Sequence, residues 1–133
     1  MDKTALVKRD IALGREFVTL LETAPSVRLE AAFWWLDEGE WEFIVATPVV
    51  HERGRMGAMT EIEHALGHRF NEFKSILDRI RVLSPSEGVV TVLDIGSLGS
   101  PPKDRVIKEE SVNGAYVEGA DVYLFAPKTY MPA

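Results

Sequence analysis

The chain has 133 residues, 46% of them hydrophobic and 27% charged, which is typical of one ordinary globular domain spanning 1–133. Its net charge of −6 argues against a protein that binds the nucleic-acid backbone, which usually carries a basic excess. The absence of cysteine excludes disulfides, thiol catalysis and cysteine-ligated zinc, and no apolar run approaches the roughly 20 residues that span a bilayer.

The first predicted element is an amphipathic helix over residues 3–24. Asp2 or Thr4 is a suitable N-cap, and Pro25 ends the helix. Apolar residues recur at steps of three and four and form a wide face suited to packing on a sheet: Leu6, Val7, Ile11, Leu13, Phe17, Val18, Leu20 and Leu21.

The segment from Val27 to Val50 is predicted to form a β-hairpin that turns around Glu38-Gly39. One register pairs apolar residues that then share a face: Leu36 with Trp41, Trp34 with Phe43, and Ala32 with Val45. The opposite face also collects apolar residues: Leu29, Ala31, Phe33, Trp35, Ile44 and Ala46. A half-buried hairpin alternates apolar and polar residues, so this one needs cover on both faces. Either helices flank both sides, or one face is a contact surface.

A polar loop is predicted at 51–57, and a second helix is predicted to begin at Thr60, because Thr60 to Glu63 fits a capping box. Gly67 interrupts the helix and predicts a bend or a close contact. The apolar stripe runs on through the following residues: Met59, Ile62, Leu66, Phe70, Phe73, Leu77 and Ile80.

The stretch 79–96 has two interpretations. Val89 to Val92 has strand propensity, whereas Ser84-Pro85-Ser86-Glu87 carries the start signals of a helix. We favour a strand at 79–83 followed by a helix at 85–95. After a loop at 96–104, Asn113-Gly114 between two extended segments predicts a second hairpin. Gly119 predicts a bulge, because the apolar phase shifts after it.

The predicted order of elements is therefore α-β-β-α-β-α-β-β. This order indicates a single α+β domain with two layers, in which helices pack on a mixed or mostly antiparallel sheet. It leaves the order of the strands within the sheet open.

Glu61, His64 and His68 are the candidate metal ligands, because their spacing aligns them along one side of a helix. They do not form an HExxH motif, and they lie on the predicted outer face of the helix. A solvated helix face with an ordinary Glu–His pair is the simpler interpretation. We therefore predict no metal site and no cofactor.

Two predicted loops carry the candidate ligand-binding residues. His51 is a candidate general base, while Arg53 and Arg55 are candidates for binding an anion. Lys103 follows a glycine- and serine-containing run at 96–100, which lacks the GK[ST] ending of a phosphate-binding loop. For the first loop, a charged connector that stays in water is the simpler interpretation.

Four carboxylates crowd the tip of the first hairpin: Asp37, Glu38, Glu40 and Glu42. No EF-hand spacing is present, so they more simply keep the turn soluble and discourage edge pairing. The aromatic residues of the same hairpin have no Lys or Arg between them, although base-stacking surfaces need such cationic support. Core packing or a protein interface fits these aromatic residues better.

The sequence does not specify a reaction. We favour a non-enzymatic domain that contacts protein, either itself as a homodimer or another chain, and neither nucleic acid nor membrane. Its interface is expected to include Trp34, Trp35 or Trp41. The first residues lack the apolar core of a secretory signal, which favours the cytoplasm. The alternative is a small enzyme or ligand-binding protein with a site near 51–55 and 96–103.

Overall fold

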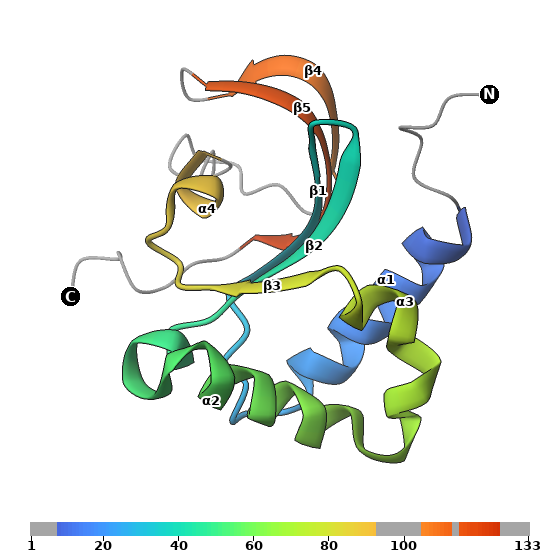
Figure 1. Cartoon of the computed structure of the whole chain (residues 1–133), viewed down its shortest axis with the longest axis vertical. Coiled ribbons are helices and arrows are strands. Elements are labelled where there is room, and N and C mark those ends of the chain that lie inside the picture. The colour runs from blue at the N-terminus through green and yellow to red at the C-terminus, as the bar shows by residue number, and fades with distance from the viewer. Residues whose placement is uncertain (1–7, 93–104, 113–114, 126–133) are drawn as a thin grey trace.

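The computed structural model of the chain describes residues 8–92, 105–112 and 115–125. The order of its elements confirms the α+β domain predicted from the sequence (Figure 1). In chain order the elements are α1 (Lys8–Glu22), β1 (Ala31–Asp37), β2 (Glu40–Ala46), α2 (Val49–Leu66), the 3₁₀ helix η1 (Gly67–Phe73), α3 (Lys74–Leu77), β3 (Ile80–Leu83), α4 (Gly88–Val92), β4 (Arg105–Val112) and β5 (Ala115–Phe125).

The strands form one mixed sheet in the order β3-β2-β1-β5-β4. β3 runs parallel to β2, and the other neighbouring strands are antiparallel. Val112 pairs with Ala115, which confirms the second hairpin, although Asn113-Gly114 itself lies outside the described residues. The first hairpin has the predicted register, with Leu36 opposite Trp41, Trp34 opposite Phe43 and Ala32 opposite Val45.

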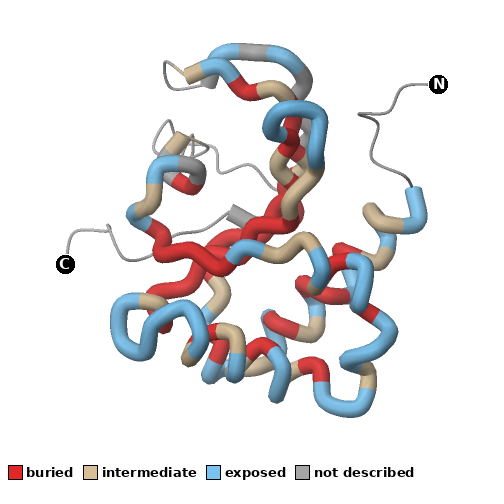
Figure 2. The backbone as a smooth tube through the Cα atoms, viewed as in Figure 1, coloured by how far each residue is buried: buried red, intermediate tan, exposed pale blue. Residues whose placement is uncertain are grey.

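Both faces of the first hairpin are buried, and helices lie on both sides of it (Figures 1 and 2). One face packs on α1, α2 and α3 and forms the larger core. The other face forms a second core, to which α4 contributes Val90. Leu29, expected on the second face, packs against the larger core instead. It precedes β1, so the alternation of a strand does not apply to it.

Helix α1 ends at Glu22, before Pro25, and buries the predicted apolar face. Phe17 is fully buried at the centre of that face. Gly14 lies where the helix meets β5, because a Cβ at this position would come within 2.4 Å of the Tyr123 hydroxyl oxygen. Glycine permits this close approach of helix and sheet. The predicted start of the helix lies outside the described residues.

The prediction of a polar loop at 51–57 is wrong, because α2 already begins at Val49. Two helical parts join at Gly54, whose φ of 75° and ψ of 175° are not helical. The start signal is Thr47, whose Oγ1 accepts a hydrogen bond from the Val49 N–H at 3.1 Å. The predicted capping box is not used, since the Thr60 hydroxyl donates to a carbonyl one helical turn earlier.

Gly67 ends α2 with a φ of 55°, which confirms the predicted bend. Beyond it the chain continues as η1 and α3. Ile62 and Phe73 are buried as the apolar stripe predicts, but Phe70 is 39% exposed. The bend and the 3₁₀ geometry after it change the direction of the side chains, so the stripe does not continue unbroken.

Strand β3 and helix α4 confirm the favoured interpretation of the ambiguous stretch. The Ser84 Oγ accepts a hydrogen bond from the Ser86 N–H at 3.2 Å, and the Glu87 carboxylate accepts one from the Ser84 N–H at 3.0 Å. These reciprocal bonds start the helix, as the sequence signal predicts. The rest of the predicted helix and the loop after it lie in 93–104, outside the described residues.

The predicted bulge at Gly119 is wrong, because β4 and β5 keep one register on both sides of this residue. The register shift lies between β1 and β5, where Tyr123 is inserted between two paired residues. Gly119 instead makes room for side chains of the first hairpin. A Cβ there would lie 3.2 Å from atoms of Leu36 and Trp41.

Candidate functional site

The tip of the β1–β2 hairpin and the turn between α3 and β3 line a hollow of about 480 Å³ that is open to solvent. Trp41 is the aromatic residue of its lining, which also contains two arginines, Arg79 and Arg81, and a larger number of carboxylates. The carboxylates belong to Asp37, Glu38, Glu40, Glu42 and Asp78. The lining therefore carries a net negative charge.

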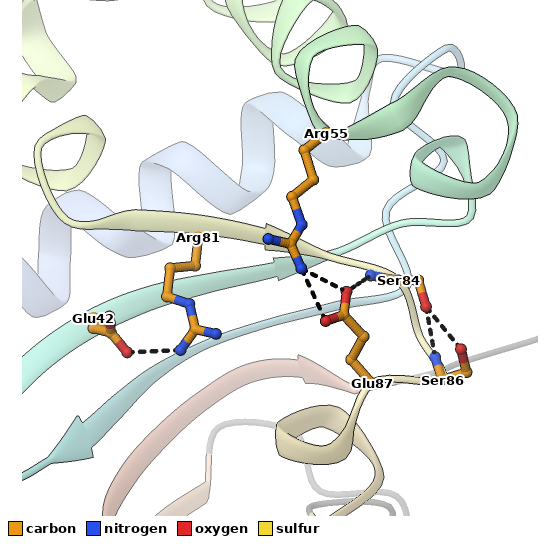
Figure 3. Close-up of polar contacts among 6 residues, drawn as sticks. All are labelled: Glu42, Arg55, Arg81, Ser84, Ser86 and Glu87. Atoms are coloured by element: carbon orange, nitrogen blue, oxygen red, sulfur yellow. Dashed lines mark hydrogen bonds and ion pairs between the residues drawn. The ribbon is translucent and has the colours of Figure 1, made fainter.

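Both guanidinium groups of the cavity are held by carboxylates. The Arg81 Nη1 lies 3.0 Å from the Glu42 Oε1 (Figure 3). The Arg79 Nη2 lies 2.9 Å from the Asp10 Oδ2 of α1, and its guanidinium carbon lies 4.7 Å from the centre of the Trp34 ring. These partners already use the positive charge of the two arginines. The four other carboxylates of the lining form no salt bridge within the described part of the chain.

The turn of the hairpin is held rigidly by β5. The Glu118 carboxylate accepts hydrogen bonds from the N–H groups of Glu38 at 2.9 Å and Gly39 at 3.1 Å. Both turn residues have positive φ, 52° and 80°, which is the shape of a type I′ turn. Gly119 leaves the space beside β1 that the Trp41 ring occupies. These contacts order the turn beside the hollow.

The three tryptophans predicted at an interface differ in exposure. Trp34 is fully buried, and its Nε1–H donates to the Tyr123 hydroxyl at 3.1 Å. Trp35 and Trp41 are half-buried, Trp35 against the second core and Trp41 against the larger one. Trp34 has no surface to offer a second molecule, because helices cover its face of the hairpin. The interface prediction is narrowed to Trp35 and Trp41.

The two arginines predicted to bind an anion already have carboxylate partners. Arg53 pairs with Glu61, which lowers the pKa of the Glu61 carboxyl below its ordinary value. The Arg55 Nη2 lies 3.0 Å from the Glu87 carboxylate (Figure 3). Neither guanidinium group is arranged to receive an anionic ligand.

His51 is exposed in the first turn of α2. Lys103 lies outside the described residues, as does the whole of 96–103. Residues 51–55 of the predicted ligand site thus lie on an exposed part of α2. The contribution of 96–103 stays a prediction.

The candidate metal ligands do not come together. Glu61 is engaged by Arg53, and the bend at Gly67 separates His68 in η1 from the line of α2. Among the residues that the structure describes, no three His, Cys, Asp or Glu side chains are placed to hold a metal ion. We expect the melting temperature to be the same with and without EDTA. A lower melting temperature in EDTA that zinc restores would contradict this.

Glu87 joins α4 to the helical layer on the other side of the sheet. Its carboxylate accepts a hydrogen bond from the Ser84 N–H, and the Arg55 Nη2 lies 3.0 Å and 3.3 Å from its two oxygens (Figure 3). These contacts, the backbone bond first, lower the pKa of the Glu87 carboxyl below its ordinary value of 4.5. The charged form is therefore the one that the fold stabilises.

We expect Glu87→Gln to lower the free energy of unfolding at neutral pH by about 0.5–2 kcal/mol, the range for loss of a helix cap. Because the folded pKa is lowered, this contribution is present above the unfolded pKa and is lost as pH falls through the folded value. Urea titrations at pH 7 and at about pH 3 measure the difference, with Glu63→Gln on the exposed side of α2 as the control. The same deficit at both pH values would contradict the assignment.

The hairpin carboxylates and Trp41 are recognisable in the sequence as candidates, whereas Asp78, Arg79 and Arg81 are not. These three reach the hairpin tip because β3 pairs in parallel with β2. Two parallel strands are joined by a long connection, which here contains three helical elements. No local pattern in the sequence therefore predicts that β3 pairs with β2.

Comparison of the chain with protein-family models, with curated proteins and with solved structures finds no match. Among the described residues, no helix combines the length and the apolar character needed to cross a membrane. The function is therefore argued from the geometry and charge of the surface itself.

Proposed function

We propose that the protein is a non-catalytic interaction domain that binds another protein through the tip of the β1–β2 hairpin. The observation that carries this proposal is the position of Trp41. Trp41 is half-buried and lines the open hollow beside the turn whose N–H groups the Glu118 carboxylate binds. Tryptophan is among the residues that most often anchor protein interfaces, usually in a hollow that excludes water.

The ordered backbone of the hairpin tip favours a binding surface over a turn that is only solvated. An interface loses less entropy on binding when its backbone is already ordered, and the Glu118 carboxylate orders the turn at Glu38 and Gly39. The lining combines Trp41 with charged side chains. Tryptophan is enriched at protein interfaces, and the rims of such interfaces are polar.

The charge at the tip favours a different chain as the partner rather than a second copy. In a twofold dimer the same patch lies on both sides of the interface. The carboxylates of one tip would then face those of the other, which is unfavourable. A partner with a complementary, basic surface avoids this repulsion.

Self-association through the opposite face is a second proposal with separate support. Trp35 is half-buried at the margin of the second core, where Val92 of α4 also packs. The homodimer expected from the sequence would form its interface at this apolar margin. The site near 51–55 has less support as a ligand site, because Arg53 and Arg55 are engaged by carboxylates.

The proposal is tested by capturing a partner with the full chain, identifying and purifying it, and measuring how tightly it binds. We expect Trp41→Ala to weaken binding of that partner at least about tenfold in calorimetric titrations, as for an interface hot spot. Phe70→Ala, which removes an exposed aromatic ring outside the cavity lining, should leave the affinity unchanged. Equal affinities of the wild type and Trp41→Ala would rule out the tip as the contact surface.

Sedimentation velocity over a range of concentrations tests the second proposal. A dimer that Trp35→Ala dissociates, while Trp41→Ala does not, supports self-association through the opposite face. A monomer at the highest concentration measured contradicts it.

A further inference from the structure

We infer that the Glu87 carboxylate, held by Arg55, closes the outer edge of β3 and prevents this edge from pairing with β3 of a second copy of the chain. This inference does not depend on the hairpin tip. It combines the position of β3 in the sheet, the direction of its backbone groups and the contacts of Glu87.

Strand β3 lies at one end of the sheet, and β2 is the one strand of the described chain that pairs with it. The carbonyls of Arg79 and Leu83 accept hydrogen bonds, at 2.9 Å and 3.0 Å, from β2 and from the residue that follows it. Because successive residues of a strand point their backbone groups in opposite directions, those of Ile80, Val82 and Ser84 point to the outer edge. Such a row of backbone groups is a template for another strand.

The Glu87 carboxylate occupies one end of this outer edge. It accepts a hydrogen bond from the Ser84 N–H at 3.0 Å (Figure 3). The carbonyl oxygen of an added strand would accept from the same N–H at about 2.7–3.2 Å. The carboxylate oxygen therefore lies where that carbonyl oxygen would lie, and its negative charge repels it.

Arg55 keeps the Glu87 carboxylate in this position. It extends from α2 past the end of β3, and its Nη2 lies 3.0 Å and 3.3 Å from the two carboxylate oxygens (Figure 3). The pair thus joins the layers on the two faces of the sheet at its outer edge. Arg81 adds a charged side chain on β3 itself, paired with Glu42. Charged side chains on an edge strand discourage pairing with another chain.

The opposite end of the sheet is interrupted in a different way. In β4, Glu109 has a φ of 42°, outside the extended region, so the outer edge of β4 is not regular there. No residue of β3 has a positive φ. The edge of β3 is therefore regular, and side chains rather than the backbone have to close it.

The sequence of β3 suits pairing with itself once the edge is open. In an antiparallel pair about a twofold axis, Val82 lies opposite its counterpart in the second copy, and Ile80 lies opposite Ser84. Arg81 then lies opposite Leu83, so like charges do not meet. A second copy of β3 is therefore the strand that an opened edge would accept.

Substitution of Glu87 tests the inference on the full chain. Glu87→Ala removes the acceptor of the Ser84 N–H, and a twofold pair then gains a backbone hydrogen bond at each end. We expect self-association in sedimentation velocity to be about tenfold or more tighter than that of the wild type. Arg55→Ala should change it in the same direction and by less. Equal association of Glu87→Ala and the wild type would overturn the inference.

Amide exchange with deuterium identifies the surface that associates. In Glu87→Ala, the Val82 N–H should exchange more slowly as the protein concentration rises, because it then bonds to the second copy. The Arg81 N–H points to β2, so its exchange should not depend on concentration. Association that leaves the exchange of Val82 unchanged would rule out pairing through this edge.

Two further variants separate the open edge from other causes of association. Tyr123→Phe removes a buried hydrogen bond with Trp34 and leaves Glu87 intact, so it should associate no more tightly than the wild type. Equal association of Tyr123→Phe and Glu87→Ala would show that lower stability is the cause. Trp35→Ala combined with Glu87→Ala should still associate. If it does not, the association uses the opposite face and the inference is wrong.

Discussion

Phe17→Ala should lower the free energy of unfolding by about 3–5 kcal/mol. Phe17 is fully buried where α1 meets the sheet, with its ring centre 5.3 Å from that of Phe43 and 5.5 Å from that of Phe73. Both pairs are edge-on, a favourable arrangement of aromatic rings. The surrounding strand and helices leave little scope for collapse around the vacated space. The loss is a large share of the roughly 5–15 kcal/mol that stabilises a typical domain.

Denaturant titration measures this loss, and Phe73→Ala should produce a loss in the same range. The double variant should lose less than the sum of the two, because the rings of Phe17 and Phe73 contact each other. Phe70→Ala is the matched control, since Phe70 is 39% exposed in the same 3₁₀ helix as Phe73. A loss below about 1 kcal/mol at both buried positions would show that the helix faces are misassigned.

Tyr123→Phe should lower the free energy of unfolding by about 1–3 kcal/mol through the loss of one hydroxyl group. This hydroxyl accepts a hydrogen bond from the Trp34 Nε1–H at 3.1 Å and donates one to the Ile11 carbonyl at 2.6 Å. Without it, the Trp34 donor remains in the core with no acceptor. Tyr116→Phe is the matched control, because Tyr116 is 64% exposed on the same strand.

The dependence of stability on alkaline pH is a second test of the role of Tyr123. Burial, more than any neighbouring charge, raises the pKa of its hydroxyl well above the ordinary value of 10.0. In the unfolded chain the hydroxyl ionises near its ordinary pKa, while in the folded chain it keeps its proton. The stability of the wild type therefore falls as pH rises above about 10, and Tyr123→Phe removes this part of the fall. Identical alkaline slopes of the wild type and Tyr123→Phe in urea titrations would refute the assignment.

The first hairpin illustrates what local sequence determines. Side chains alternate along a strand with period two, and the turn at Glu38-Gly39 sets which residues lie opposite each other. The register and the cross-strand partners of Trp34 and Trp41 follow from these facts alone. The apolar residues on both faces indicated that both need cover, and the fold decided that helices supply it. The start of α4 was predictable for a similar reason, because Ser84 and Glu87 act on backbone groups within a few residues.

The prediction of a loop at 51–57 is wrong because it assumes that a polar, glycine-containing segment has no regular secondary structure. These residues are polar because this part of α2 is largely exposed, and Gly54 interrupts the helix without ending it. The Thr47 hydroxyl accepts a hydrogen bond at the start of the helix, but Thr47 directly follows β2 and falls within the segment predicted to be the hairpin. Intrinsic preference is a weak guide where packing on a sheet decides the outcome.

The cavity at the hairpin tip shows what only the tertiary structure decides. From the sequence, the hairpin carboxylates indicate an acidic turn and Trp41 is an expected interface residue, but no hollow is predicted. The cavity forms because β3 pairs with β2 and brings Arg79 beside the tip, and because Glu118 of β5 binds the turn. Strand pairing between distant segments depends on the balance of packing over the whole chain rather than on any short window. Local chemistry thus determined most of the elements and the two faces of the first hairpin, and long-range strand pairing created the candidate site.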